Sequence, residues 1–346
     1  MISTLQTMQS CKIENIRICD IDLSDETFKI SSDNDISSLT GSIKSIGMIN
    51  MPMVKQVKVN QIKDKYVVIS GFKRIRAIKL IGITQIQAVV IESDDKFCSC
   101  LAISDNAFQR ELNIMEQVRG VRLLKHFISS DQEIIQNSLQ IFNIKMNASL
   151  INMFDDIARM PESVHKLIEN ERLSINCAAK FKQYGYNNDL IEVFVQLFSK
   201  IKTSLSKQKE IITNIHEIAA RENISISELM ESEELKNILN SSENDENRKG
   251  NLLRSALFNR RYPNLSKAKE QFTEKMKDLH SQGSLRSDIK LEPPVDFEGK
   301  DYTVSFKVSN LKEFRDKIEN LKAVSETHYV IFPFSIERPC SLRHNE

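Results

Sequence analysis

The segment at residues 69–82, ISGFKRIRAIKLIG, combines a glycine with closely spaced cations. A strand is predicted to end just before Gly71, which allows a close backbone approach, and a helix to begin directly after it. The first turn of this helix holds Lys73, Arg74 and Arg76, although cations at this end oppose the helix dipole. Free backbone N–H groups and these cations together predict a phosphate site. The alternative is a solvated cationic face without a ligand.

Residues 102–116, AISDNAFQRELNIME, add oxygen donors. Asp105 and Asn106 carry oxygens of the kind that magnesium accepts alongside phosphate oxygens, and Gln109 or Arg110 is placed to reach the same site. Taken alone, an Asp-Asn pair is more typical of a helix cap. Because a nucleoside triphosphate needs both a phosphate cradle and a divalent ion, the two segments together predict a nucleotide site with magnesium.

A third segment, residues 131–160, has the layout of a helix-turn-helix. Two helices are predicted at residues 132–142 and 147–159, with a short turn between them. The candidate DNA contacts are polar residues in the turn and early in the second helix, namely Lys145, Asn147, Ser149 and Asn152. The alternative is an ordinary helical hairpin, which Asp155, Asp156 and the lack of a glycine in the turn favour. Since phosphate contacts supply most DNA affinity, we expect this module to bind weakly by itself.

The elements that position these residues are strands near the N-terminus and helices beyond them. Within residues 51–91, the runs MPMVKQVKV and KYVVIS predict a hairpin, followed by a helix and the strand QIQAVVIE. Together they predict a small mixed sheet. Ahead of it, Ile36, Leu39, Ile43 and Ile46 fall at helical spacing, and Gly47 follows as a C-terminal cap.

The rest of the chain is predicted to be mostly helical. Apolar residues recur at helical spacing from residue 99 to about 230, and the polar stretch SSENDENRKGN near residue 241 indicates a linker or exposed turn. A helix at residues 252–279, an alternating strand at residues 302–308 and the helix LKEFRDKIENLKAV follow. The predicted class is α+β, with domains at residues 1–115, 116–240 and 241–346.

Composition indicates a globular protein. The 346 residues include 48 Lys and Arg against 47 Asp and Glu, a net charge of +1 that argues against a wholly basic nucleic-acid coat or a polyacidic tail. No stretch approaches a membrane span, the N-terminus lacks a secretory pattern, and the six cysteines are scattered, so we expect reduced thiols in the cytoplasm.

The near-neutral total conceals strongly charged blocks. Residues 55–79 contain eight basic residues and one acidic residue, residues 222–246 contain one basic and eight acidic residues, and residues 247–269 contain seven basic residues and no acidic one. The third block, which includes Phe258 and Tyr262, either contacts nucleic acid or neutralises the acidic block before it. DNA affinity is therefore expected to be modest and local, and to depend on dimerisation or nucleotide.

In order and spacing, these segments resemble the ParB-type chromosome and plasmid partition proteins. That family carries a G-E-R-R-x-R-A box and a later E-N-x-x-R box followed by L-N/T-P-x-E, which correspond here to GFKRIRA at 71–77 and DNAFQRELNIME at 105–116. The segment MPESVHKLIENERLSINCAAKF at 160–181 is similar to the family's sequence after its helix-turn-helix. The resemblance covers residues 13–184 and also relates the N-terminal fold to sulfiredoxin, although residues 71–77 include no cysteine.

The resemblance implies an N-terminal domain that binds CTP with magnesium. It places phosphate contacts at Gly71, Lys73, Arg74 and Arg76, with Asp105 and Asn106 near the metal and Arg110 as the displaced arginine of the second box. Phe72 replaces the family's Glu, and Lys73 replaces an Arg and so lacks its bidentate fork. The family also implies a DNA-binding homodimer, a nucleoid location in the cytoplasm, no membrane association, a partner ATPase and the capacity for CTP hydrolysis.

Three functions are consistent with these residues. The first is a ParB-like partition or nucleoid-associated regulator in which a CTP-type nucleotide acts as a switch. The second is an enzyme that uses the same phosphate cradle for nucleotide hydrolysis, phosphotransfer or nuclease chemistry, with Asp105, Glu111 or Glu116 as acid–base candidates. The third is a protein-interaction adaptor with a degenerate pocket.

Overall fold

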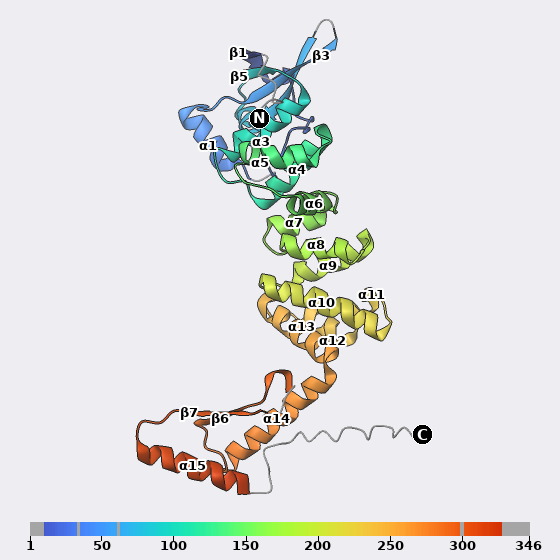
Figure 1. Cartoon of the computed structure of the whole chain (residues 1–346). Coiled ribbons are helices and arrows are strands. Elements are labelled where there is room, and N and C mark those ends of the chain that lie inside the picture. The colour runs from blue at the N-terminus through green and yellow to red at the C-terminus, as the bar shows by residue number, and fades with distance from the viewer. Residues whose placement is uncertain (1–9, 33–34, 61–62, 298–300, 327–346) are drawn as a thin grey trace. The chain divides into compact units, whose positions relative to one another are not determined.

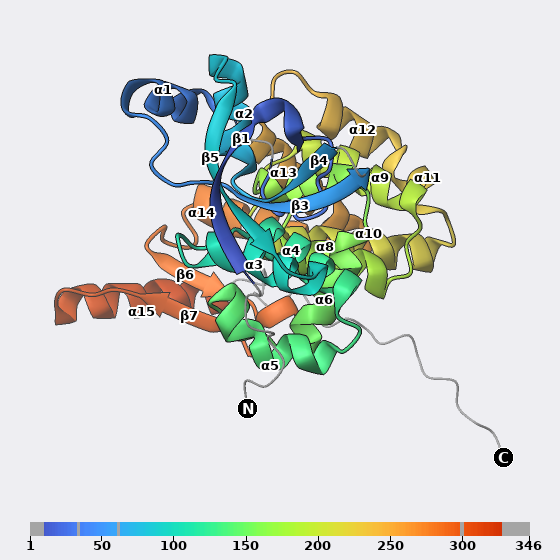
Figure 2. The same cartoon turned by 90° about the horizontal axis from the view of Figure 1, so that it is seen from above.

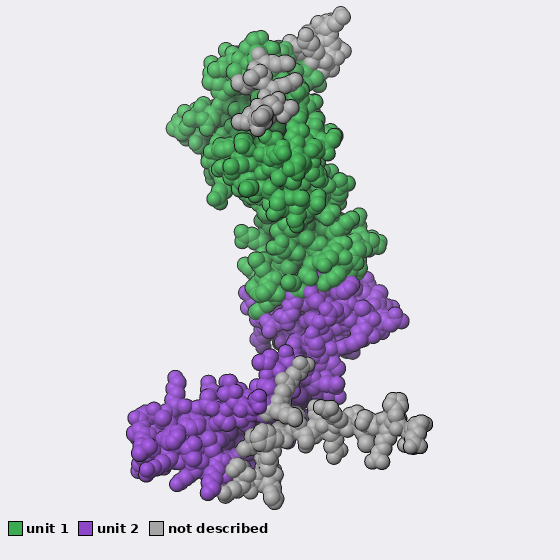
Figure 3. All heavy atoms as spheres, in the orientation of Figure 1, with its two compact units in different colours: residues 1–209 green, residues 210–346 purple. Residues whose placement is uncertain are grey.

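The computed structural model describes residues 10–32, 35–60, 63–297 and 301–326. The chain divides into two compact units, Met1–Lys209 and Glu210–Glu346, which Figure 3 colours separately. Among the described residues, no helix is long and apolar enough to cross a membrane. Cys340 lies outside the described residues, and the five other cysteines are free thiols.

The first unit contains a five-stranded mixed sheet in the order β1-β5-β3-β4-β2 (Figure 2). Its strands are β1 (Ser10–Arg17), β2 (Ile21–Asp22), β3 (Met53–Asn60), β4 (Lys63–Ser70) and β5 (Gln85–Glu92). β3 and β4 form the predicted antiparallel hairpin, and β5 pairs parallel to β3. The prediction of a small mixed sheet is therefore confirmed.

The strands β1 and β2 were not predicted from the sequence. β1 pairs antiparallel with β5 at the edge of the sheet, and most of its side chains are exposed. Its apolar residues Ile13 and Ile16 are three positions apart, so they point to opposite faces and give no alternating pattern. β2 has only two residues, which is too short for a periodic signal.

Two helices complete the core of this sheet domain. α1 (Ser37–Ile46) ends at Gly47, which has a φ of 82°, as the predicted C-terminal cap requires. α2 (Phe72–Ile81) buries Ile75 and Ile78 in the same apolar cluster as Val54 and Val68 of the sheet. Burial of this face holds the start of α2 in a fixed place next to the end of β4.

The first unit continues with seven helices that follow one another along the chain (Figure 1). They are α3 (Asp95–Ala107), α4 (Ile114–Phe127), α5 (Asp131–Phe142), α6 (Ala148–Ala158), α7 (Glu162–Glu169), α8 (Ile175–Gln183) and α9 (Asn188–Lys200). Most begin at a residue whose side-chain oxygen accepts the N–H of the third helical residue, as Ser130 does for Glu133. The predicted helix-rich region is confirmed.

The second unit begins within α10 (Leu205–Glu222). It contains the helices α11 (Ile226–Met230), α12 (Glu233–Asn240), α13 (Glu246–Arg261), α14 (Pro263–Ser281) and α15 (Leu311–Glu326), and a two-stranded sheet of β6 (Ile289–Glu292) and β7 (Thr303–Phe306). Leu285, Ile289 and Val324 form a small buried cluster beside the two strands. The predicted α+β class with a small C-terminal module is confirmed.

Three details of this region differ from the sequence prediction. The stretch SSENDENRKGN is only partly a turn, because Asp245 caps α13, which begins at Glu246. The predicted helix at residues 252–279 is broken, because Pro263 cannot continue α13 and instead occupies the first turn of α14. The strand predicted to reach residue 308 ends at Phe306, and its partner β6 was not predicted.

Candidate nucleotide site and DNA interface

The turn between β4 and α2 needs glycine. Gly71 has a φ of 97° and a ψ of 22°, in the left-handed region that residues with a Cβ rarely adopt. A Cβ on Gly71 would lie 2.9 Å from Cβ of Pro52. The predicted close backbone approach is thus present, and it brings residues 50–52 against the start of α2.

The start of α2 has the properties of an anion site. No side chain caps it, and its first turn contains no acidic residue, so its first N–H groups keep the positive end of the dipole. Because Gly71 has no Cβ, the backbone at this turn can lie against Pro52 and the Arg74 guanidinium. These features fit a phosphate group.

The predicted phosphate residues have different surroundings in the structure. Arg74 donates from Nη1 to the carbonyl oxygens of Asn50 and Met51, both at 2.9 Å. Arg76 donates to the Glu26 carboxylate at 2.7 Å. Among the described residues, the Lys73 side chain has no hydrogen-bond or ion-pair partner, so it is the cation most available to a ligand.

Asp105 joins this group from the last turn of α3. Its carboxylate accepts hydrogen bonds from the Ser70 hydroxyl and from Nε2 of Gln109, the latter at 2.8 Å, and lies 3.6 Å from the Arg74 guanidinium. Burial lowers the pKa of Arg74, and the Asp105 charge opposes that shift. The end of β4, the start of α2 and the end of α3 therefore meet at one place.

Asn106 and Arg110 are not part of this cluster. The Asn106 side chain donates to the Ala102 carbonyl of its own helix at 2.8 Å. The alternative that Asp105 and Asn106 cap a helix N-terminus is wrong, because both lie near the C-terminal end of α3. Arg110 makes a bidentate pair with Glu116, at 2.7 and 2.6 Å, at the start of α4.

Glu116, an acid–base candidate in the enzyme hypothesis, has a structural role. Its side chain is 2% exposed and forms a capping box with Asn113 in addition to its pair with Arg110. Of the three acid–base candidates, Asp105 is hydrogen-bonded in the cluster and Glu111 is exposed.

The sequence reading missed Ser70 and the carbonyl groups of Asn50 and Met51. Ser70 directly precedes Gly71 and is the one polar residue after the apolar run VVI, which was an available signal. No sequence signal could have indicated the carbonyl contacts, because every residue has a backbone carbonyl whatever its type.

A metal site made by the protein alone is not present among the described residues, where no three His, Cys, Asp or Glu side chains are grouped to hold an ion. Asp105 can supply one carboxylate. A magnesium ion at this place would need phosphate oxygens and water as its other ligands, which fits the way magnesium is usually bound with nucleotides.

The helix-turn-helix layout is present in α5 and α6. Asn143 takes the left-handed conformation at the end of α5, with a φ of 57°, so it does what a glycine would do. The Ser138 hydroxyl accepts the N–H of Met146 at 3.0 Å, and Met146 is buried. The lack of a glycine is therefore no obstacle to a tight turn.

All four predicted DNA-contact residues, Lys145, Asn147, Ser149 and Asn152, are exposed. Asn147 also caps α6, because its side-chain oxygen accepts the N–H of Leu150 at 2.8 Å. Asp155 faces Arg159 and Lys125. Burial raises its pKa, but hydrogen bonds from these two cations outweigh burial and lower it. The negative charge of Asp155 is thereby compensated by these two cations.

Three of the four arginines of the third charged block are paired within the second unit. Arg260 binds Glu222 at 2.7 Å, Arg254 lies 3.5 Å from Glu210, and Arg261 pairs with Glu217. These pairs favour neutralisation over nucleic-acid binding. The carboxylates come from α10, and only Glu222 belongs to the acidic block.

Comparison with known proteins finds similarity in the N-terminal region that holds the candidate nucleotide site. Residues 3–107 match the family described as ParB N-terminal domain. The chain is 24% identical over 148 residues to a probable chromosome-partitioning protein ParB of Xylella fastidiosa, which covers 42% of this chain and 44% of that protein. It is 25% identical over 139 residues to the nucleoid occlusion protein of Listeria monocytogenes, which covers 40% of this chain and 45% of that protein.

Solved ParB structures are more distant. The ParB of Caulobacter crescentus complexed with CTP-γ-S shares 18% identity with a TM-score of 0.26, and covers 54% of this chain and 98% of that chain. The same protein complexed with the centromeric parS site shares 17% identity with a TM-score of 0.34, and covers 62% of this chain and 95% of that chain.

These findings define a protein with a mixed-sheet N-terminal domain of the ParB type followed by helices. The predicted resemblance to the ParB-type partition proteins is confirmed, and the chain carries a ParB N-terminal domain. The aligned region spans less than half the length of the Xylella and Listeria relatives.

Proposed function

We propose that the protein is a ParB-like partition or nucleoid-associated regulator whose N-terminal domain binds a CTP-type nucleotide with magnesium. The observation that carries this proposal is the cluster of Ser70, Gly71, Arg74 and Asp105, which places an uncapped helix start, a cation and a carboxylate together. The choice of CTP follows the Caulobacter relative, which was solved with CTP-γ-S.

In this proposal each of the three predicted domains has its own role. Residues 1–115 would bind the nucleotide, residues 116–240 would contact DNA through α6, and residues 241–346 would join two copies. A nucleotide that is bound better in one dimer arrangement than in the other would act as the switch. A partner ATPase and a location on the nucleoid belong to the proposal by family analogy.

The C-terminal module supports a homodimer. A two-stranded sheet is marginal by itself, and the buried cluster that it forms with the end of α14 and with α15 is small. Large apolar residues on β7 and α15 remain exposed, namely Val304, Leu311, Phe314 and Ile318. We propose that a second copy of this chain covers them, because among the described residues β6 and β7 pair only with each other, so another copy can extend their outer edges.

Calorimetry with CTP and magnesium tests the nucleotide site. Lys73→Gln removes the available cation without breaking an internal contact, and we expect it to weaken binding roughly tenfold. Lys79→Gln, an exposed lysine in the last turn of the same helix, is the matched control and should bind as the wild type does. If the wild type releases no heat with CTP, or if Lys73→Gln and Arg74→Ala both bind normally, the nucleotide proposal fails.

A further inference from the structure

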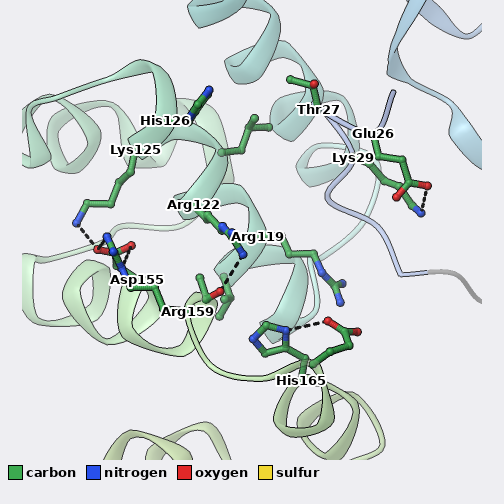
Figure 4. A pocket seen from close by; sticks show the side chains of 14 residues that line it. Glu26, Thr27, Lys29, Arg119, Arg122, Lys125, His126, Asp155, Arg159 and His165 are labelled. Carbon is green, nitrogen blue, oxygen red and sulfur yellow. Dashed lines mark hydrogen bonds and ion pairs between the residues drawn. The ribbon is translucent and has the colours of Figure 1, made fainter. Parts of the chain in front are cut away.

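A pocket lies in the first unit beside the candidate nucleotide site (Figure 4), and Glu26, which accepts a hydrogen bond from Arg76, belongs to its lining. It is a cavity of about 660 Å³ between residues 26–29, the middle of α4, the end of α6 and the start of α7. Its lining contains more cations than carboxylates. The charged and histidine residues are Lys29, Arg119, Arg122, Lys125, His126, Arg159 and His165 against Glu26, Asp155 and Glu162.

The carboxylates of the pocket are already paired. Asp155 accepts from Lys125 at 3.3 Å and from Arg159 at 3.1 Å. Glu162 lies 3.2 Å from Nδ1 of His165, and Glu26 lies 2.7 Å from the Lys29 ammonium. These contacts leave no carboxylate of the pocket lining without a cation or histidine.

Arg122 is the cation that this arrangement leaves without a counter-charge. It is exposed, and the contact that the structure gives its guanidinium is with the Ala158 carbonyl at 2.9 Å. No carboxylate pairs with it in the described part of the chain. Figure 4 shows its side chain directed into the pocket. The remaining N–H donors of the planar guanidinium suit the oxygens of a phosphate group.

The neighbours of Arg122 on α4 strengthen the positive charge. Arg119 and Lys125 are three residues away on either side, and such positions lie on one helix face. Like charges at this spacing oppose helix stability. Arg119 is held by Glu169 and by the Ser32 hydroxyl, and Lys125 by Asp155 and Asp131, whereas Arg122 is not so compensated.

We propose that this pocket binds a phosphate group, with Arg122 as its principal contact. Arg122 is on α4 and is not one of the predicted nucleotide contacts, although Glu26 of the pocket lining also pairs with Arg76. Phosphate binding by Arg122 goes beyond the proposed function. The phosphate can come from a DNA backbone or from a free phosphate compound. The DNA source has a geometric reason, because Arg159 is 73% exposed and follows Ser149 and Asn152 on the same face of α6.

The experiment titrates the full-length protein with inorganic pyrophosphate. Binding is followed by the imidazole NMR signals of His126 and His165, which line the pocket, so that pyrophosphate bound at Gly71 is not counted. We expect saturable shifts in the wild type and an affinity about tenfold lower in Arg122→Gln. Arg248→Gln, an exposed arginine outside the pocket, is the control and should bind normally.

A second arm identifies the source of the phosphate. If it is a DNA backbone, pyrophosphate competes with a duplex, and Arg122→Gln lowers the slope of DNA affinity against salt by about one. If it is a free compound, Arg122→Gln leaves DNA binding unchanged while its pyrophosphate binding is weakened. The proposal is overturned if pyrophosphate leaves both histidine signals unmoved, or if Arg122→Gln binds it as the wild type does while its melting temperature is unchanged.

Discussion

The three cations among the predicted phosphate contacts differ in how free their side chains are to bind a ligand. Arg74 is held by backbone carbonyls 23 and 24 residues away along the chain, and Arg76 by Glu26, 50 residues away. Lys73, directly before Arg74 in the sequence, has no such partner among the described residues. A sequence pattern places all of these cations at one helix start, but only contacts made by distant segments decide which of them can meet a ligand.

Replacing Gly71 tests the tight turn at the residue scale. Gly71→Ala forces a Cβ into the left-handed region and against Pro52, so we expect a loss of about 2–3 kcal/mol in the free energy of unfolding. Gly82→Ala is the matched control, because Gly82 is also left-handed, with a φ of 85°, but has open space around its Cβ. Urea denaturation of both variants measures the difference. Equal losses would mean that the contact with Pro52 has no cost.

Whole elements were predicted where their periodicity was strong. The sequence placed α5 and α6 within one residue of their observed ends, because their apolar faces are regular and their caps are typical. It missed β1, whose side chains are mostly exposed at the edge of the sheet. An edge strand is defined by its hydrogen-bond partner more than by its own residues.

The segment before α1 is tied to two helices, and this tie should depend on pH. Glu169 of α7 accepts hydrogen bonds from the Ser32 hydroxyl and from Arg119 of α4. Burial raises the pKa of Glu169, but these two partners outweigh it, and the net shift is below the ordinary value of 4.5. The stabilisation is therefore complete above about pH 4.5 and is lost as the pH falls through the lower, folded-state pKa.

Glu169→Gln should lower the free energy of unfolding at pH 7 and reduce its decline below about pH 4.5. Urea denaturation at several pH values measures both effects. Glu111→Gln, at an exposed position without a side-chain partner among the described residues, should change neither. An unchanged acid dependence in Glu169→Gln would show that the tie does not contribute to stability.

At the scale of the whole molecule, the two basic blocks, residues 55–79 and 247–269, differ in how far their cations are paired. The basic residues near Gly71 include the candidate ligand contacts, whereas Arg254, Arg260 and Arg261 of α13 are paired with α10. The same net charge in two blocks of sequence thus gives one candidate binding surface and one internal network. Pairing with a distant helix decides which block can bind phosphate, since the carboxylate partner of a paired cation compensates its positive charge.

The proposed dimer gives a test at the same scale. Phe314→Glu puts a charge into the exposed apolar face of α15, which a second copy would bury, so we expect the protein to shift from dimer to monomer. Sedimentation equilibrium measures the change in mass. Lys312→Glu, on the same helix and exposed, is the control and should stay dimeric. A wild type that is monomeric at high concentration would contradict the proposed interface.

The sequence by itself determined the helix-rich class, the hairpin before α2, the glycine turn and the two helices of the helix-turn-helix. Each of these depends on local conformation or on a regular apolar face, which neighbouring residues specify. The tertiary structure alone decided that Asp105 meets Ser70 and Arg74, that Arg110 pairs with Glu116, and that Arg122 has no carboxylate partner in the described part of the chain. Those outcomes depend on packing between segments far apart in the chain, which brings charges together or keeps them apart.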